Sequence, residues 1–318
     1  MAKLIIYLDQ NFVSNMAKAK FLGGGSLASE LQEYAEIYDR LKSLVDDDKV
    51  ICPESEFHNL ETIEPDLAGP AQRGLTTLSY GLCFRSHFEI GRLQAYRAAR
   101  EFLNLAPEGT PQWEDAFDDD PNEPVVNRTF QWGTGRAIPT IPWQIDSSPP
   151  RPNKYMSDRR AAGGKFIWAD LPERIKQEKD RLVQYMYGDH IDQYSTGEAG
   201  LLWETWRSLD APPEKLADFL KSDHLRNLPF IDIHCTLCAA MDCEKGRQPR
   251  ESDALDTLIM AVVLPYCDVV ATSSDMKGLF TQTGLAGRYP ARLYSAKKQG
   301  LQDLANFLVA LKYAVASK

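Results

Sequence analysis

Short apolar runs and longer amphipathic segments alternate along the chain. The run Leu4–Leu8 ends directly in Asp9, and the sequence KVICP at 49–53 repeats the pattern of a short buried strand. A third short apolar run lies around Val269–Ala271, and a fourth covers residues 291–295. The pattern therefore predicts four short strands, two near each end of the chain.

Segments with apolar residues three or four positions apart fill the space between these runs. They predict helices at 10–20, 26–45, 54–62, 92–105, 170–188, 201–209, 212–222, 252–264 and 301–315. Short apolar strands separated by helices indicate an α/β fold with a mostly parallel central sheet and helices on both faces.

The middle of the chain has a different composition. Between residues 107 and 164 Pro, Gly, Asp and Arg dominate, with isolated Trp113, Trp132 and Trp143. The stretch at 146–153, which is rich in proline and serine, is typical of a loop or linker. We therefore expect a long irregular insertion here, followed by helices.

Charge is distributed unevenly along the chain. The net charge is −9, yet residues 101–127 alone carry eight acids and no Lys or Arg. Residues 128–165 carry seven basic residues against two acids. This basic segment is a candidate phosphate-binding surface, and the acidic segment is either a solvated loop or an intramolecular lid that mimics phosphate.

The six cysteines are too few for a disulfide-stapled scaffold of 318 residues. The sequence HCTLCAAMDC places His234, Cys235, Cys238 and Cys243 at spacings that resemble a zinc site. It contains no Gly or Pro between the cysteines, and its spacing also suits an amphipathic helix. Small apolar packing residues on a helix and a zinc site both remain open interpretations.

No apolar run approaches the roughly 20 residues of a membrane span, and the N-terminus does not have the pattern of a signal peptide. We therefore expect a cytoplasmic protein that does not bind membranes.

Acidic residues follow two of the predicted strands. Asp9 comes directly after the first strand, and Asp275 comes shortly after the strand at Val269–Ala271. Ligand sites in parallel sheets lie beyond the carboxyl ends of the strands, which is where both acids are expected. The alternative for each is a simple helix-capping role.

Two helices offer further acids. Asp253 and Asp256 are three residues apart and share one helix face, although Asp253 also suits the first turn after a Ser252 cap. His58 and Glu61 share a face of the helix that follows the second strand. Burying unpaired carboxylates is costly unless a cation compensates, which favours a metal site.

The motifs YLDQN, PESEFHNLET with Arg73 downstream, and DALDTLIMAVVLPYCDVVATSSD resemble, in their order, a bacterial branch of the PIN-like nucleases. The resemblance implies a three-layer fold with a catalytic core at 1–100 and 225–318 and an insertion at 101–224. It implies that Asp9, Glu61, Asp256 and Asp275 are catalytic metal ligands. One departure is that two serines separate Thr272 from Asp275.

The resemblance further implies a Mg²⁺- or Mn²⁺-dependent endoribonuclease with a toxin or phage-defence role and an antitoxin or regulatory partner. Hard divalent cations prefer such oxygen ligands and activate water for phosphodiester hydrolysis. Residues of the matching motifs supply the auxiliary groups, whereas the candidate substrate-binding residues are arginines that flank the motifs or lie in the basic segment at 128–165. The auxiliary residues are Asp253, His58, Asn11 and Ser273, and the substrate-binding residues are Arg73, Arg250, Arg159 and Arg160.

Two alternatives use the same residues. The acids suit cleavage of single-stranded DNA as well as of RNA, and the fold also suits a catalytically inactive scaffold that binds nucleic acid or a protein partner. A nucleotide-binding enzyme is disfavoured because no Gly-rich loop follows a predicted strand.

Overall fold

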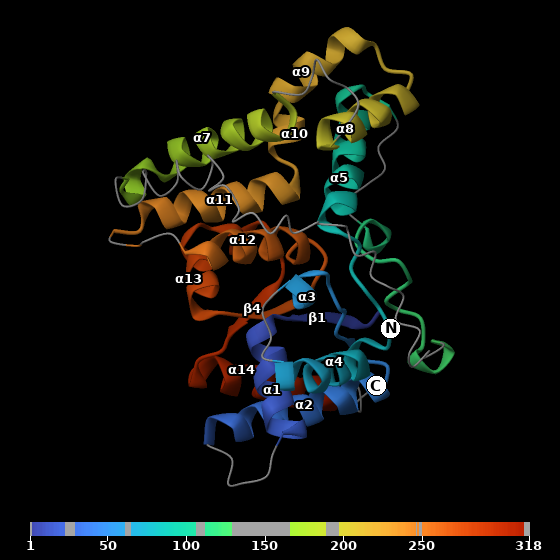
Figure 1. Ribbon diagram of the computed structural model, residues 1–318, viewed down its shortest axis with the longest axis vertical. Helices are drawn as coiled ribbons and strands as arrows, with labels where there is room; N and C mark the ends of the chain where they lie inside the picture. Colours follow the sequence, from blue (N-terminus) through green and yellow to red (C-terminus); the bar gives the residue numbers. More distant parts are fainter. Residues whose placement is uncertain are drawn as a thin grey trace. The chain divides into compact units, whose positions relative to one another are not determined.

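The computed structural model divides the chain into two compact units (Figure 1). The first unit comprises Met1–Ser86, Gln112–Gln131 and Val263–Lys318, and the second comprises His87–Pro111 and Trp132–Val262. The residues that the structure describes are 2–22, 29–60, 65–105, 112–128, 166–188, 197–245, 247 and 250–314.

The first unit is built on a four-stranded sheet in which every strand is parallel to its neighbours. The strands are β1 (Leu4–Leu8), β2 (Val50–Ile51), β3 (Val269–Thr272) and β4 (Arg292–Ser295), in the order β2-β1-β3-β4. All four short strands expected from the apolar runs are confirmed. Because the strands are parallel, their carboxyl ends meet at one edge of the sheet.

Helices cover this sheet. They are α1 (Gln10–Phe21), α2 (Ser29–Asp46), α3 (Phe57–Leu60), α4 (Pro65–Ser79), α13 (Ser274–Gln282) and α14 (Lys298–Ala314), with the short turn η6 (Leu285–Gly287). Helix α1 packs on α2 and α4, and α2 packs on α14. Figure 1 shows these four helices together on one side of the sheet. The sheet is buried because Ile6, Leu8, Val270 and Ala271 are fully inaccessible.

Most of the described part of the acidic segment, at 112–127, belongs to the first unit. Residues 112–128 contain two short helical turns, η1 (Trp113–Asp115) and η2 (Val125–Asn127). Phe117 is fully buried, and its ring centroid lies 4.4 Å from that of Phe84. At the other end, the Lys3 backbone N–H donates to Asn122 Oδ1 over 3.0 Å. Residues 112–128 are therefore neither a freely solvated loop nor part of a separate insertion.

The second unit is helical in its described residues. Its elements are α5 (His87–Phe102), η3 (Trp168–Asp170), α7 (Leu171–Val183), the π-helical turn η4 (Gln184–Gly188), α8 (Gly197–Ser208), η5 (Pro213–Lys215), α9 (Leu216–Lys221), α10 (Asp223–Arg226), α11 (Pro229–Cys243) and α12 (Glu251–Val263), whose last residue belongs to the first unit. Helix α11 packs along α7, and α5 packs on α8 and α10.

Helix α11 carries the cysteine-rich sequence and is buried on every face from Phe230 to Cys243. Burial raises the pKa of the Cys235 and Cys243 thiols, so both favour the protonated form that packs like a small apolar group. Cys238 Sγ lies 3.6 Å from His234 Nε2 on the next turn. These observations support packing rather than zinc binding for this sequence.

The observed division differs from the expected core at 1–100 and 225–318. Residues 87–100 and 225–262 belong to the second unit, because α5 packs on α8 and α10 and because α11 packs along α7. Conversely, 112–131 belongs to the first unit, where Phe117 fills a core position. Within the described ranges, no helix has the length and apolar character that crossing a membrane requires.

Candidate functional site

The carboxyl edge of the sheet begins at Asp9, the residue directly after β1. Its backbone N–H donates to the Ala271 carbonyl of β3 over 2.9 Å, so Asp9 continues the parallel pairing. The side chain is only 8% exposed, and its Oδ1 accepts the N–H groups of Asn11 (3.0 Å) and Phe12 (3.2 Å). The capping role expected as an alternative is therefore present, and it fixes the direction of the carboxylate.

The adjacent strand β3 leads to the second acid of this edge. Ser273 caps α13 by accepting the Met276 N–H at its Oγ over 3.2 Å, which leaves Asp275 in the exposed first turn. The additional residue between Thr272 and Asp275 is thus used to form the cap. Asp9 and Asp275 follow neighbouring parallel strands at the same edge, one buried and one exposed to solvent.

His58 holds the end of β1 in place. Its Nδ1 accepts the Ser55 backbone N–H over 3.0 Å, so Nε2 carries the proton that it donates to the Leu8 carbonyl over 2.8 Å. The ring also stacks on Tyr7, whose hydroxyl lies 3.0 Å from Ser55 Oγ. Burial lowers the pKa of His58, which keeps the ring neutral.

This geometry corrects the expected role of His58. Both ring nitrogens are engaged by Leu8 and Ser55, so the described partners of His58 are structural, whereas the sequence led us to expect an auxiliary role at a metal site. It positions the residue that precedes Asp9.

Glu54 is the buried acid of the segment after β2. Its carboxylate accepts hydrogen bonds from Gln72 Nε2 (2.8 Å), Thr76 Oγ1 (3.0 Å) and Ser79 Oγ (2.8 Å), all from α4. The sequence pattern favoured Glu61, which lies outside the described residues. The signal for Glu54 was the spacing of Gln72, Thr76 and Ser79, which places three donors along one helix face.

Asp253 and Asp256 lie on α12 in the second unit, on the predicted helix. Asp253 is 2% exposed, and it accepts Arg247 Nη2 at 2.8 Å and the Arg250 backbone N–H at 2.9 Å. Its carboxylate is thus used by a backbone hydrogen bond in the first turn and by an ion pair, and Ser252, expected as the cap, lies inside α12, which begins at Glu251. Asp256 is half-buried.

The remaining auxiliary and substrate-binding candidates are either exposed or outside the described residues. Asn11, Arg73 and Arg250 are exposed, and Arg73 projects from α4. Arg159 and Arg160 lie outside the described residues, as do Trp132 and Trp143.

The metal set expected from the sequence is therefore brought together only in part. Asp9 and Asp275 share one sheet edge, with the hydroxyls of Thr272 and Ser273 beside them in sequence. Within the described ranges, no group of three or more His, Cys, Asp or Glu side chains is arranged to hold a metal ion. The oxygen donors present suit Mg²⁺ or Mn²⁺ better than a softer metal.

Comparisons of the chain with protein-family models, with curated proteins and with solved structures find no match. The architecture itself classifies the first unit as α/β, with a four-stranded parallel sheet flanked by helices.

Proposed function

We propose that the chain is a metal-dependent endoribonuclease whose reaction takes place at the carboxyl edge of the β2-β1-β3-β4 sheet. The observation that carries the proposal is the placement of Asp9 and Asp275 after two neighbouring parallel strands. Active sites of open parallel sheets form at this edge, between the loops that follow the strands.

The donor chemistry supports a hard divalent cation. Asp9 and Asp275 would hold Mg²⁺ or Mn²⁺, which when bound activates water and stabilises charge on the phosphate oxygens. Glu61 and Asp256 complete the proposed set on the resemblance to PIN-like nucleases. Exposed Arg73 and Arg250 would bind the phosphate backbone, together with Arg159 and Arg160.

The chain's own contribution is a fixed orientation of Asp9. The His58 hydrogen bond holds the Leu8 carbonyl, and the N–H groups of Asn11 and Phe12 hold Oδ1. A ligand whose direction is set before the cation binds loses less conformational freedom on binding. His58 is therefore a positioning residue in this proposal.

RNA as the substrate, a toxin or phage-defence role, a regulatory partner and a cytoplasmic location complete the proposal. They rest on the resemblance of the three motifs alone. Single-stranded DNA is the alternative substrate, because the same acids suit either nucleic acid.

A catalytically inactive scaffold that binds nucleic acid or a protein partner is the second candidate. Two observations favour it: the Asp9 Oδ1 and both Asp253 oxygens already have structural partners, and Asp275 is exposed.

One experiment separates the two candidates. The full chain is incubated with end-labelled RNA and with single-stranded DNA, in Mn²⁺ or in EDTA. We expect cleavage of RNA in Mn²⁺ only, and loss of more than about 100-fold in rate for Asp9→Asn, since removing one ligand charge weakens a metal site strongly.

The matched control is Asp268→Asn. Asp268 accepts the Ile5 N–H at the opposite, amino end of β3, and the amide oxygen of Asn preserves this bond. Cleavage that resists EDTA, or that is equal in Asp9→Asn and wild type, would contradict the metal site. Binding of RNA without cleavage would establish the scaffold instead.

A further inference from the structure

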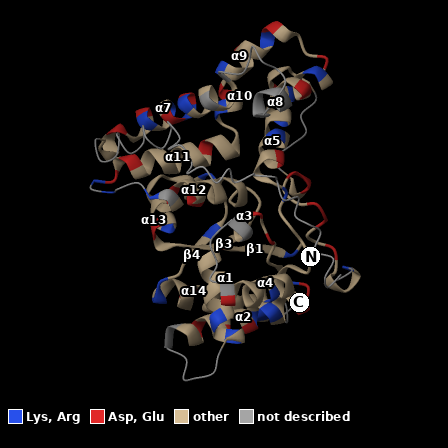
Figure 2. Ribbon diagram, viewed as in Figure 1, with Lys and Arg blue, Asp and Glu red and all other residues tan. Residues whose placement is uncertain are grey.

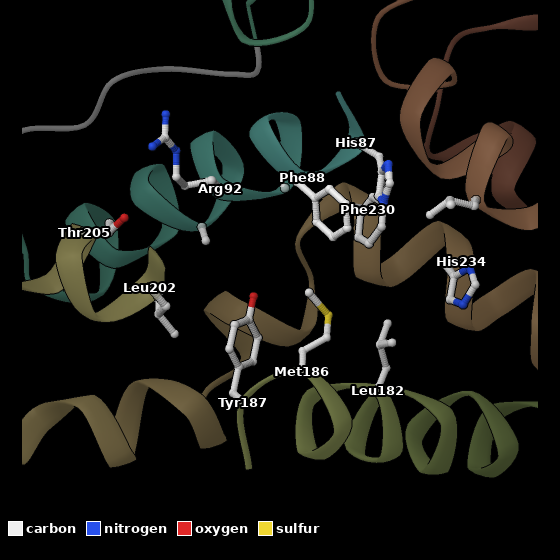
Figure 3. A pocket seen from close by; sticks show the side chains of 13 residues that line it. His87, Phe88, Arg92, Leu182, Met186, Tyr187, Leu202, Thr205, Phe230 and His234 are labelled. Atoms are coloured by element: carbon white, nitrogen blue, oxygen red, sulfur yellow. The ribbon is translucent and has the colours of Figure 1, made fainter. Parts of the chain in front are cut away.

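The second unit contains a pocket that no step of the proposed reaction uses. Its volume is about 160 Å³, and its walls come from α5, α7, η4, α8, α11 and α12 (Figure 3). For comparison, an apolar cavity of roughly 150 Å³ in another protein is large enough to bind benzene. The pocket therefore has room for a small ring system.

Aromatic and sulfur-containing side chains form much of the wall. Figure 3 shows Phe88 and Phe230 on one side and Met186 and Tyr187 facing them from the other. Aromatic rings prefer offset or edge contacts with another ring, and a thioether adds a favourable contact at a ring edge. A flat aromatic ligand matches this wall better than a flexible aliphatic chain.

Among the described residues that line the pocket, the one with a permanent charge is Arg92. Arg92 of α5 is exposed, and in Figure 3 its guanidinium extends away from the apolar side chains. No Asp or Glu is among the described residues that line the pocket. A negative group is therefore attracted at the solvent side, where it stays hydrated while the ring is buried.

We propose that this pocket binds a small planar aromatic carboxylate, with the ring between Phe88, Phe230 and Met186 and the carboxylate beside Arg92. The Tyr187 hydroxyl, which points into the pocket in Figure 3, supplies a hydrogen-bonding group for a polar ring atom. The proposal does not depend on the nuclease activity.

The test is a titration of the full chain carrying ¹³C-methyl methionine, one of whose seven methionines is Met186. The probes are indole-3-carboxylate, neutral indole and cationic 3-(aminomethyl)indole. We expect indole-3-carboxylate to shift the Met186 methyl resonance saturably, while Met276, buried in the first unit, does not move. The carboxylate should bind about two- to fivefold more tightly than indole, as one exposed charge contact allows.

Gly91 offers a variant that fills the pocket without crowding the fold. It lines the pocket on α5, and a Cβ added there meets no atom within 4 Å. Gly91→Phe should weaken probe binding at least about tenfold by occupying the ring site, and loss of a helical glycine does not itself destabilise α5. Gly69→Phe on α4, whose Cβ also meets open space, is the matched control in the first unit.

Arg92→Gln tests the charge without filling the pocket. It should make indole-3-carboxylate and indole bind equally, whereas Arg207→Gln on exposed α8 surface should keep the preference. Three results would overturn the proposal. They are the absence of a Met186 shift with every probe, an unchanged affinity of Gly91→Phe for indole-3-carboxylate, and binding of the cationic probe to the wild type as tightly as indole-3-carboxylate.

Discussion

Buried carboxylates have neutral partners in the first unit and cationic partners in the second. In the first unit, Glu54 accepts hydrogen bonds from three uncharged side chains, and Asp9 Oδ1 accepts two backbone N–H groups. In the second unit, Arg174 Nη2 lies 2.7 Å from Asp242, and Lys179 Nζ lies 2.7 Å from Asp232. Figure 2 shows acidic and basic residues interleaved along α7, which supplies both of these cations.

The difference bears on where each unit can bind a cation. The α7–α11 seam is formed by Arg174, Glu178, Lys179, Asp232 and Asp242, and Arg181, whose Nη1 lies 2.9 Å from Glu178 Oε1, supplies the third cation that balances its three carboxylates. The acids of the first unit are stabilised by dipoles, which orient a carboxylate without cancelling its charge. A divalent ion therefore gains more at the sheet edge than at the seam.

Replacing Arg174 is expected to have the largest effect. Arg174→Met leaves Asp242 and Glu178 buried without this cation, and breaking such a pair costs about 3–5 kcal/mol of unfolding free energy. Urea unfolding measures the loss, and amide hydrogen exchange should localise it to peptides of α7 and α11.

The double variant Arg174→Met/Asp242→Leu sharpens this prediction. Replacing both members of a buried pair by apolar groups is often neutral, so the double variant should recover much of the lost stability. Asp180→Asn, which breaks the more exposed pair with Arg226, should cost at most about 1 kcal/mol. Equal losses in Arg174→Met and Asp180→Asn would contradict the role of the seam.

Glu54 provides the corresponding test in the first unit. Glu54→Ala removes the acceptor of Gln72, Thr76 and Ser79, and Ser79 is fully buried. Hydrogen bonds to a charged group are worth about 1.5–3 kcal/mol, so we expect a loss of about 2–3 kcal/mol in urea unfolding. Glu54→Gln keeps one acceptor and should lose less; if both variants lose the same, the three donors are not what stabilises this site.

The sheet was predictable from the sequence because each strand is a short apolar run with a polar exit. The division into units was not, because it depends on contacts between distant residues. The Lys3 bond to Asn122 joins residues 119 positions apart, and Phe117 packs on Phe84, which precedes α5 in the chain. No local pattern marks the acidic stretch as a part of the first unit.

In the candidate site, the position of Asp9 was predictable from the sequence, and the roles of His58 and Glu54 were not. A strand exit placed Asp9 correctly at the carboxyl edge, since that position follows from parallel pairing alone. The roles of His58 and Glu54 depend on which backbone or α4 group faces each side chain. Spacing shows that two residues share a helix face, but not whether a partner already satisfies them.

His58 makes the stability of the first unit depend on pH. Burial lowers the pKa of His58 in the folded chain. Near and below pH 6.5 the His58 ring is therefore protonated in the unfolded chain while it stays neutral in the folded chain. The contribution of His58 is therefore complete above this value and is lost as the pH falls below it, by up to about 1.4 kcal/mol per unit until the folded pKa is reached.

Urea unfolding at pH 7.5 and 5.5 measures this dependence. His58→Gln should be less stable at pH 7.5 and should lose less stability than wild type on acidification. The control is His224→Gln, at a side chain that is 39% exposed, which should follow the wild type. A His58→Gln variant with the same pH dependence as wild type would show that the ring is not held neutral.

Asp9 gives the smallest expected change in stability and the sharpest link to function. Asn caps a helix as well as Asp does, so Asp9→Asn should change the unfolding free energy by less than about 0.5 kcal/mol, whereas Asp9→Ala should lose about 1 kcal/mol with the cap. Mn²⁺ should raise the melting temperature of wild type but not of Asp9→Asn, because only the carboxylate supplies charge to the cation. If Mn²⁺ stabilises both proteins equally, Asp9 is a cap and nothing more, and the contrast between the two units concerns folding alone.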